Sequence, residues 1–106
     1  MPSSLRELAY LEARKHIFRI TLVAMDDGGD ILYRQRTPTP RDNYAAILRA
    51  IADLVERVET TLGQAGSIGI GAPGAASAVD GRMKNCNTTC LNGQALQRDL
   101  EALMQR

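Results

Sequence analysis

The sequence predicts an α/β domain with a mixed sheet, because segments with strand periodicity and helix periodicity alternate along its 106 residues. Ile17–Met25 alternates its apolar side chains at the period of a strand. Thr39–Leu62 carries apolar residues every three or four positions, which is the period of a helix. Ser67–Gly71 is a short run of isoleucine and glycine that predicts a further strand. A helix that crosses between two strands makes those strands parallel.

Two antiparallel strands are predicted around the sequence DDGG at Asp26–Gly29, which is typical of a hairpin turn. The first strand is Ile17–Met25, and its partner is Ile31–Arg36. One face of the first strand is apolar through Phe18, Ile20, Leu22 and Ala24. Arg34 and Arg36 make one side of the partner polar, which indicates an outer position in the sheet.

The long helix is predicted to begin at Thr39 and to lie across the sheet. Thr39 is a capping residue, Pro40 suits the first turn because its missing N–H costs nothing there, and Asp42 interacts favourably with the helix dipole. The apolar positions are Tyr44, Ile47, Leu48, Ile51, Leu54, Val55, Val58 and Leu62. Gly63 is predicted to end the helix.

A loop that can face a ligand is predicted after the strand Ser67–Gly71. Pro73 fixes its own φ and Gly74 can adopt a positive φ, so the loop is rigid and its backbone amides can point at a bound molecule. A short excursion over Ala75–Lys84 follows, and the last helix is predicted over Gln94–Gln105.

Composition excludes several classes of partner. Thirteen Lys and Arg against twelve Asp and Glu give a net charge of +1, which favours neither nucleic acid nor an acidic membrane. Apolar runs stay below the ~18–20 residues that span a bilayer, and the start lacks the order of a signal peptide, so we expect a cytoplasmic protein. Cys86 and Cys90 supply at most half of a zinc site, so we expect reduced thiols and no metal site.

From Tyr33 to its end, the chain resembles the amino-terminal part of ROK-family sugar kinases, and most of all the bacterial fructokinase and mannokinase branch. The matching pieces are LYR at Leu32–Arg34, TPTPRD at Thr37–Asp42, GIGAPG at Gly69–Gly74, Gly81, KNCNTT at Lys84–Thr89 and LNG at Leu91–Gly93. The family usually has tryptophan where this chain has Cys90. The resemblance implies an incomplete ribonuclease H-like lobe of the actin and hexokinase type, with a ROK-type lobe over residues 17–106 and a divergent segment over residues 1–16.

The resemblance implies that Gly74, Ala75 and Asn87 contact the hydroxyls of a hexose such as fructose, mannose or glucose, with Asn85 in support. Asparagine suits this task because its amide offers donors and an acceptor without adding charge. The alternative is that these asparagines only close turns and cap the last helix.

The divergent segment has two interpretations. Ser4–Glu7 has the form of a capping box, and local propensity predicts a helix over Leu5–Lys15. The resemblance instead implies a first, central strand over Tyr10–Ala13 and a phosphate loop over Arg14–Arg19.

The phosphate loop of the family has the pattern Asp-x-Gly-Gly-Thr-Lys, whereas this chain has RKHIFR at Arg14–Arg19. Those glycines let the backbone close on the nucleotide phosphates, so we expect nucleotide binding of the family type to be lost. A solvated basic turn is favoured over a new anion site formed by Arg14, Lys15, His16 and Arg19.

The intact family uses ATP and Mg, a catalytic aspartate in a later Asn-Asp pair, and a second lobe over the nucleotide. None of these precedes Arg106, so we expect no catalytic residue, metal site or cofactor site and no phosphoryl transfer by this chain alone. The alternatives are a non-catalytic interaction module and a weak sugar-binding protein. An incomplete sheet leaves an exposed edge, which predicts a homo-oligomer, for example a dimer that pairs edge strands.

Overall fold

The computed structural model describes residues 5–14, 17–40, 43–71, 75–76, 82–84 and 92–105. Its elements in chain order are β1 (Arg6–Arg14), β2 (Ile17–Met25), β3 (Ile31–Pro38), α1 (Tyr44–Leu62), β4 (Ser67–Gly71), β5 (Ala75–Ala76), β6 (Met83–Lys84) and α2 (Leu96–Met104).

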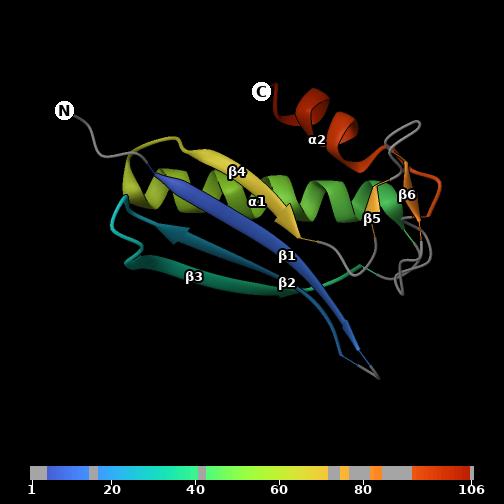
Figure 1. The fold of residues 1–106 in the computed structure, drawn as a ribbon, viewed down its shortest axis with the longest axis horizontal. Coiled ribbons are helices and arrows are strands. Elements are labelled where there is room, and N and C mark those ends of the chain that lie inside the picture. Colours follow the sequence, from blue (N-terminus) through green and yellow to red (C-terminus); the bar gives the residue numbers. More distant parts are fainter. Residues whose placement is uncertain are drawn as a thin grey trace.

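The main sheet has the strand order β3-β2-β1-β4 (Figure 1). β2 is antiparallel to both of its neighbours, and β4 is parallel to β1. α1 makes the crossover from β3 to β4, and β5 and β6 form a separate small antiparallel ladder. The predicted mixed α/β architecture is confirmed, with the hairpin, the crossover helix, the parallel strand and the final helix in the expected order.

β1 corrects the helix that local propensity predicts over Leu5–Lys15. Arg6 to Tyr10 pair with β2 on one side and with β4 on the other. Leu5, Glu7, Ala9 and Leu11 are buried, so every second residue faces the core, which is the periodicity of a strand. Tertiary pairing therefore outweighs the capping box, because a central strand pairs its backbone N–H and C=O groups with the strands on both sides.

The core lies between one face of the sheet and the two helices. The predicted apolar face of β2 faces the core at Ile20, Leu22 and Ala24, which are fully buried. Phe18, at the start of the same strand, is only half-buried and lies outside the core cluster. The buried residues of this core cluster are Leu5, Ala9, Leu11, Ile20, Leu22, Ala24, Ile47, Ile51, Leu54, Val55, Val58, Met83, Leu96 and Leu100. The apolar stripe of α1 thus packs inward, as its three-and-four spacing predicts.

The start of α1 differs from the prediction. Asn43 caps the helix, because its Oδ1 accepts a 3.0 Å hydrogen bond from the Ala46 N–H, and the helix begins at Tyr44. The Thr39 N–H instead donates to the Phe18 carbonyl at 3.1 Å. Thr39 therefore extends the pairing of β3 with β2, and the predicted start at Thr39 and Pro40 is wrong because strand pairing uses that backbone.

The end of α1 agrees with the prediction. Gly63 has a φ of 71°, and its N–H donates to the Glu59 carbonyl at 2.8 Å. This left-handed end is the conformation that favours glycine. α2 begins two residues later than predicted, at Leu96, because the Gln94 carbonyl accepts a hydrogen bond from the Met83 N–H.

Candidate functional site

The carboxyl ends of the parallel strands β1 and β4 form the candidate site. The two strands pair from Arg6 with Ser67 to Tyr10 with Gly71. β4 ends there, whereas β1 continues for four more residues to Arg14. Figure 1 shows the β1–β2 hairpin projecting beyond the end of β4. In open α/β sheets, ligands bind outside the carboxyl ends of the parallel strands.

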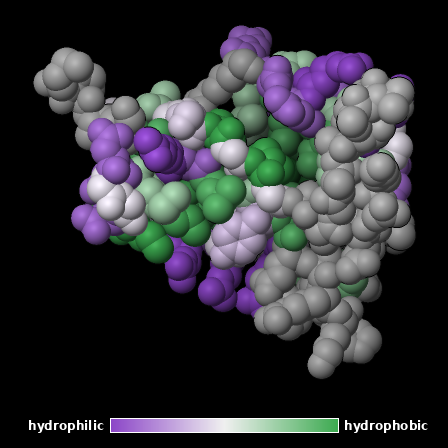
Figure 2. Space-filling model, viewed as in Figure 1, coloured by the Kyte–Doolittle hydropathy of each residue, from purple (hydrophilic) through white to green (hydrophobic). Residues whose placement is uncertain are grey.

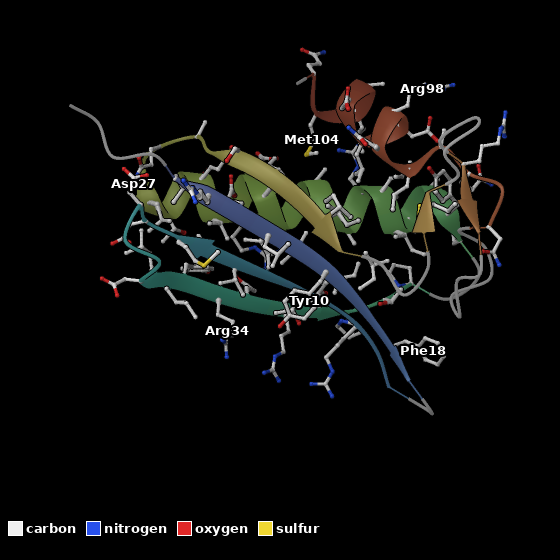
Figure 3. All side chains as sticks on the ribbon, in the orientation of Figure 1. Tyr10, Phe18, Asp27, Arg34, Arg98 and Met104 are labelled. Carbon is white, nitrogen blue, oxygen red and sulfur yellow. The ribbon has the colours of Figure 1, made fainter. Side chains whose placement is uncertain are left out.

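Gly71 allows the two strand ends to approach closely. A Cβ at Gly71 would lie 3.2 Å from the Tyr10 Cβ, which is tighter than an ordinary contact. Figure 3 shows Tyr10 on the face of the sheet that the helices leave uncovered. A glycine here keeps the chain leaving β4 tight against β1.

A turn before α2 is held against the small ladder by three hydrogen bonds of 2.7 Å. The Met83 N–H donates to the Gln94 carbonyl, and the Gly93 N–H donates to the Met83 carbonyl. Arg82 Nη1 donates to the Gly93 carbonyl. Gly93 has a φ of 81°, which explains the glycine of the sequence LNG. The Asn-Gly pair signals this turn in the sequence, but the roles of Arg82 and Met83 carry no sequence signal.

The predicted sugar contacts are described in part. The Ala75 backbone lies in β5, opposite Lys84 of β6, and follows closely after the end of β4. Gly74, Asn85 and Asn87 lie outside the described residues, as do Cys86 and Cys90. The assignment of these residues to sugar contact stays a prediction.

The segment Arg14–Arg19 forms the end of a β-hairpin. Arg14 is the last residue of β1 and pairs with Ile17, the first residue of β2. Arg19 lies in β2 opposite Glu12 and Pro38. Strand pairing therefore leaves Lys15 and His16 to connect the strands, and a long loop over Arg14–Arg19 is excluded by the register. The structures of Lys15 and His16 themselves lie outside the described residues.

A hydrogen bond between the helices stabilises the same end of the molecule. The Tyr44 hydroxyl, at the start of α1, donates to Asp99 Oδ2 at 2.7 Å. Burial raises the pKa of Tyr44 above its ordinary value, and the hydrogen bond to Asp99 and the charge of Asp99 raise it further. Tyr44 is therefore a neutral donor that fixes α2 against α1, and it is not poised to transfer a proton near neutral pH.

Among the residues that the structure describes, no cluster of His, Cys, Asp and Glu side chains could hold a metal ion. Neither described helix combines the length and the apolar character needed to cross a membrane.

Comparison with known proteins identifies relatives across most of the chain. A family model described as the ROK family matches residues 17–106. The chain is 40% identical over 88 residues to an N-acetyl-D-glucosamine kinase of Yersinia pestis, covering 83% of this chain and 34% of that protein. It is 39% identical over 88 residues to an N-acetyl-D-glucosamine kinase of Escherichia coli O139:H28, covering 83% of this chain and 29% of that protein.

The crystal structure of a ROK hexokinase from Thermus thermophilus superposes with a TM-score of 0.77 at 25% identity, over 96% of this chain and 33% of that one. The fold is thus an incomplete amino-terminal lobe of the ribonuclease H-like, actin and hexokinase type. The chain spans about a third of the length of the relatives that it matches. The predicted fructokinase and mannokinase branch is not confirmed, since the relatives from Yersinia pestis and Escherichia coli are N-acetyl-D-glucosamine kinases.

Proposed function

The chain belongs to the ROK family of sugar kinases, and we propose that it forms the sugar-binding side of a kinase for N-acetylglucosamine or a closely related hexose. The observation that carries the proposal is the parallel register of β1 and β4, which brings the ends of both strands to one side of the sheet, with β5 directly beyond. The identity of about 40% to N-acetyl-D-glucosamine kinases supports this sugar class.

The proposed sugar contacts are Gly74, Ala75, Asn85 and Asn87. Pairing of Ala75 with Lys84 brings the two chain segments that continue to Gly74 and Asn85 to the same end of the β5–β6 ladder. Amide groups and backbone N–H groups can pair with adjacent sugar hydroxyls without introducing a charge. The hydrogen bonds from Arg82 and Met83 to residues 93 and 94 would keep this small ladder in place beside α2.

We propose further that this chain alone does not hold the phosphates of ATP and does not transfer phosphate. A phosphate cradle needs consecutive backbone N–H groups that are free to face the anion. In the β1–β2 hairpin the ladder runs continuously from Arg6 and Met25 to Arg14 and Ile17. Arg14–Arg19 also contains no glycine. We also propose that the protein is cytoplasmic and has no nucleic-acid or membrane partner.

Titration calorimetry of the chain with N-acetylglucosamine, glucose, mannose and fructose tests the sugar proposal. We expect saturable heat with N-acetylglucosamine that is lost in Asn87→Ala. Gln97→Ala is the matched control, because it also removes a side-chain amide, from an exposed position of α2 that is not among the proposed contacts. If no sugar gives saturable heat at millimolar concentration, the proposed sugar site is contradicted.

A coupled assay for ADP tests the nucleotide proposal separately. With ATP, Mg and each sugar, we expect phosphate transfer no faster than in a blank prepared from cells without the protein. Transfer well above that blank, from protein free of contaminating kinase, would show that the hairpin does not prevent nucleotide use. The sugar titration and this assay can therefore fail independently.

A further inference from the structure

Arg82 reaches from the start of the small β5–β6 ladder to the turn before α2. Its side chain is exposed, and its Nη1 donates a 2.7 Å hydrogen bond to the Gly93 carbonyl, 11 positions further along the chain. A guanidinium makes a short and strong hydrogen bond, because the donor carries a charge. Since Arg82 is exposed, the contact joins two chain segments and adds little to the core.

Two main-chain hydrogen bonds lie beside the bond from Arg82. The Met83 N–H donates to the Gln94 carbonyl, and the Met83 carbonyl accepts from the Gly93 N–H, both at 2.7 Å. On its other side, Met83 pairs with Ala76 of β5. The Met83 side chain is 8% exposed and belongs to the core cluster. Met83 is therefore a fixed point at the start of the chain that leads from β6 to α2.

The turn at the other end of this segment precedes a helix that is itself anchored. Leu96 and Leu100 bury one side of α2 in the core, and Figure 2 shows hydrophilic atoms on its outward side. The Tyr44 hydroxyl holds the same helix through Asp99. The carbonyl of Gly93, which accepts the bond from the arginine, thus lies in a turn with firm support.

Two of the proposed sugar contacts lie within the segment that these bonds close. Asn85 and Asn87 follow Met83 by two and four positions and precede Gly93. The hydrogen bonds between Met83 and the turn at Gly93 bring the two ends of this segment together. Ala75, a third proposed contact, lies in the strand that pairs with β6. The base of the segment therefore bears on three of the proposed contacts.

We infer that Arg82 is a positioning residue of the proposed sugar site. Fixing the ends of a segment favours binding, because less conformational entropy is lost when its side chains bind a ligand. The bond from Arg82 to Gly93 strengthens the base of the segment that carries Asn85 and Asn87, so Arg82 acts through that segment and not as a sugar contact. The inference rests on the proposed function, because it needs that segment to bind a sugar.

Three variants separate the side-chain bond from the charge. Arg82→Ala removes the side-chain bond and leaves both main-chain bonds of Met83, so we expect this variant to fold. Arg82→Lys keeps a charged donor at the end of a long side chain, and we expect it to restore part of the effect. Arg57→Ala is the matched control, because it removes the same guanidinium from an exposed position of α1.

Titration calorimetry with N-acetylglucosamine, with circular dichroism to check folding, measures the effect on sugar binding. We expect a dissociation constant about three- to tenfold weaker for Arg82→Ala, the ratio that corresponds to ordering about one side chain. Arg82→Lys should lie between Arg82→Ala and the wild-type chain. Arg57→Ala should bind the sugar as the wild-type chain does.

Amide hydrogen exchange, measured by NMR, separates positioning from general stability. In sugar-free Arg82→Ala we expect the Gly93 N–H to exchange faster, because its bond to Met83 opens locally. The N–H of Ile51, which is buried in α1, should exchange as in the wild-type chain. Saturation with N-acetylglucosamine should restore the protection of Gly93. A purely structural role of Arg82 would change both amides together.

The outcomes distinguish this inference from the proposed function. Saturable heat with an unchanged dissociation constant in Arg82→Ala would contradict the inference and leave the proposed function intact. An equal loss of affinity in Arg57→Ala would assign the effect to net charge, which also contradicts the inference. A wild-type chain that gives no saturable heat would contradict the proposed function, and the inference with it.

Discussion

The hydroxyl of Tyr44 donates a hydrogen bond of 2.7 Å to Asp99 Oδ2 and thereby joins the first residue of α1 to the first turn of α2. The two residues are 55 positions apart in the sequence, and both are half-buried. Because α2 is only nine residues long, it depends on tertiary contacts for its stability. This bond is one of those contacts, together with burial of Leu96 and Leu100.

Tyr44→Phe should lower the free energy of unfolding by about 1–2 kcal/mol, the range for a hydrogen bond to a charged group that is partly exposed. Denaturant unfolding measures the change. Asp99→Asn and the double variant complete a mutant cycle, which isolates the coupling between the two side chains. Additive losses in the double variant would mean that the bond contributes nothing in solution.

Tyr44 should also make the free energy of unfolding decrease as the pH rises into the alkaline range. The raised pKa of Tyr44 means that the folded chain keeps the hydroxyl proton at a pH where the unfolded chain releases it. Stability from this group is therefore complete below the unfolded pKa of about 10 and is lost as the pH rises toward the folded pKa.

Denaturant unfolding between about pH 8 and pH 11 checks this dependence. The free energy of unfolding should fall more steeply for the wild-type chain than for Tyr44→Phe, because all other titrating groups are shared. Parallel curves for the two proteins would contradict the assignment.

Gly66→Ala should destabilise the fold by about 1–3 kcal/mol, the usual cost of forcing extra atoms into a packed site. A Cβ at Gly66 would lie 2.5 Å from the Leu5 carbonyl oxygen, in backbone that cannot easily move. The Ser67 N–H donates to that same carbonyl at 3.0 Å, so a shift would also weaken the start of the β1–β4 pairing.

Gly69→Ala is the control for Gly66→Ala, since the nearest atom to its Cβ is 3.7 Å away. It should leave the thermal midpoint unchanged or raise it slightly, because alanine restricts the unfolded chain more than glycine does. Equal losses for the two variants would show that chain flexibility, and not the contact with Leu5, explains the effect.

Thr39→Val should be neutral or should stabilise the fold by up to about 1 kcal/mol, because a buried hydroxyl without a partner costs free energy. Thr39 is 7% exposed, and its Oγ1 has no hydrogen-bond partner among the described residues. Valine keeps the shape and removes the polar atom. A loss of more than about 1 kcal/mol in denaturant unfolding would mean that the hydroxyl is satisfied in solution.

In the candidate site, the sequence predicted the local turns but not the contacts between residues that are distant in the sequence. The glycines around Gly71 and the Asn-Gly pair before α2 indicate turns, and the structure has Gly93 at the positive φ that such a turn requires. That Arg82 donates to the Gly93 carbonyl, 11 positions away, could not be predicted, because no pattern links an exposed arginine to a distant carbonyl.

The sequence alone determined the elements whose hydrophobic pattern agrees with their final environment. α1 has one apolar stripe and a glycine at its end, β2 alternates, and β4 begins its parallel pairing where a short apolar run begins. In each of these, local preference and burial favour the same structure. Tertiary structure decided Leu5–Lys15 and the start of α1. In β1, pairing with strands on both sides outweighs the local helix signals. At the start of α1, the Thr39 N–H donates to the Phe18 carbonyl, so Asn43 and not Thr39 caps the helix. A backbone N–H usually donates to one acceptor, and that acceptor can belong to a part of the chain that is distant in the sequence.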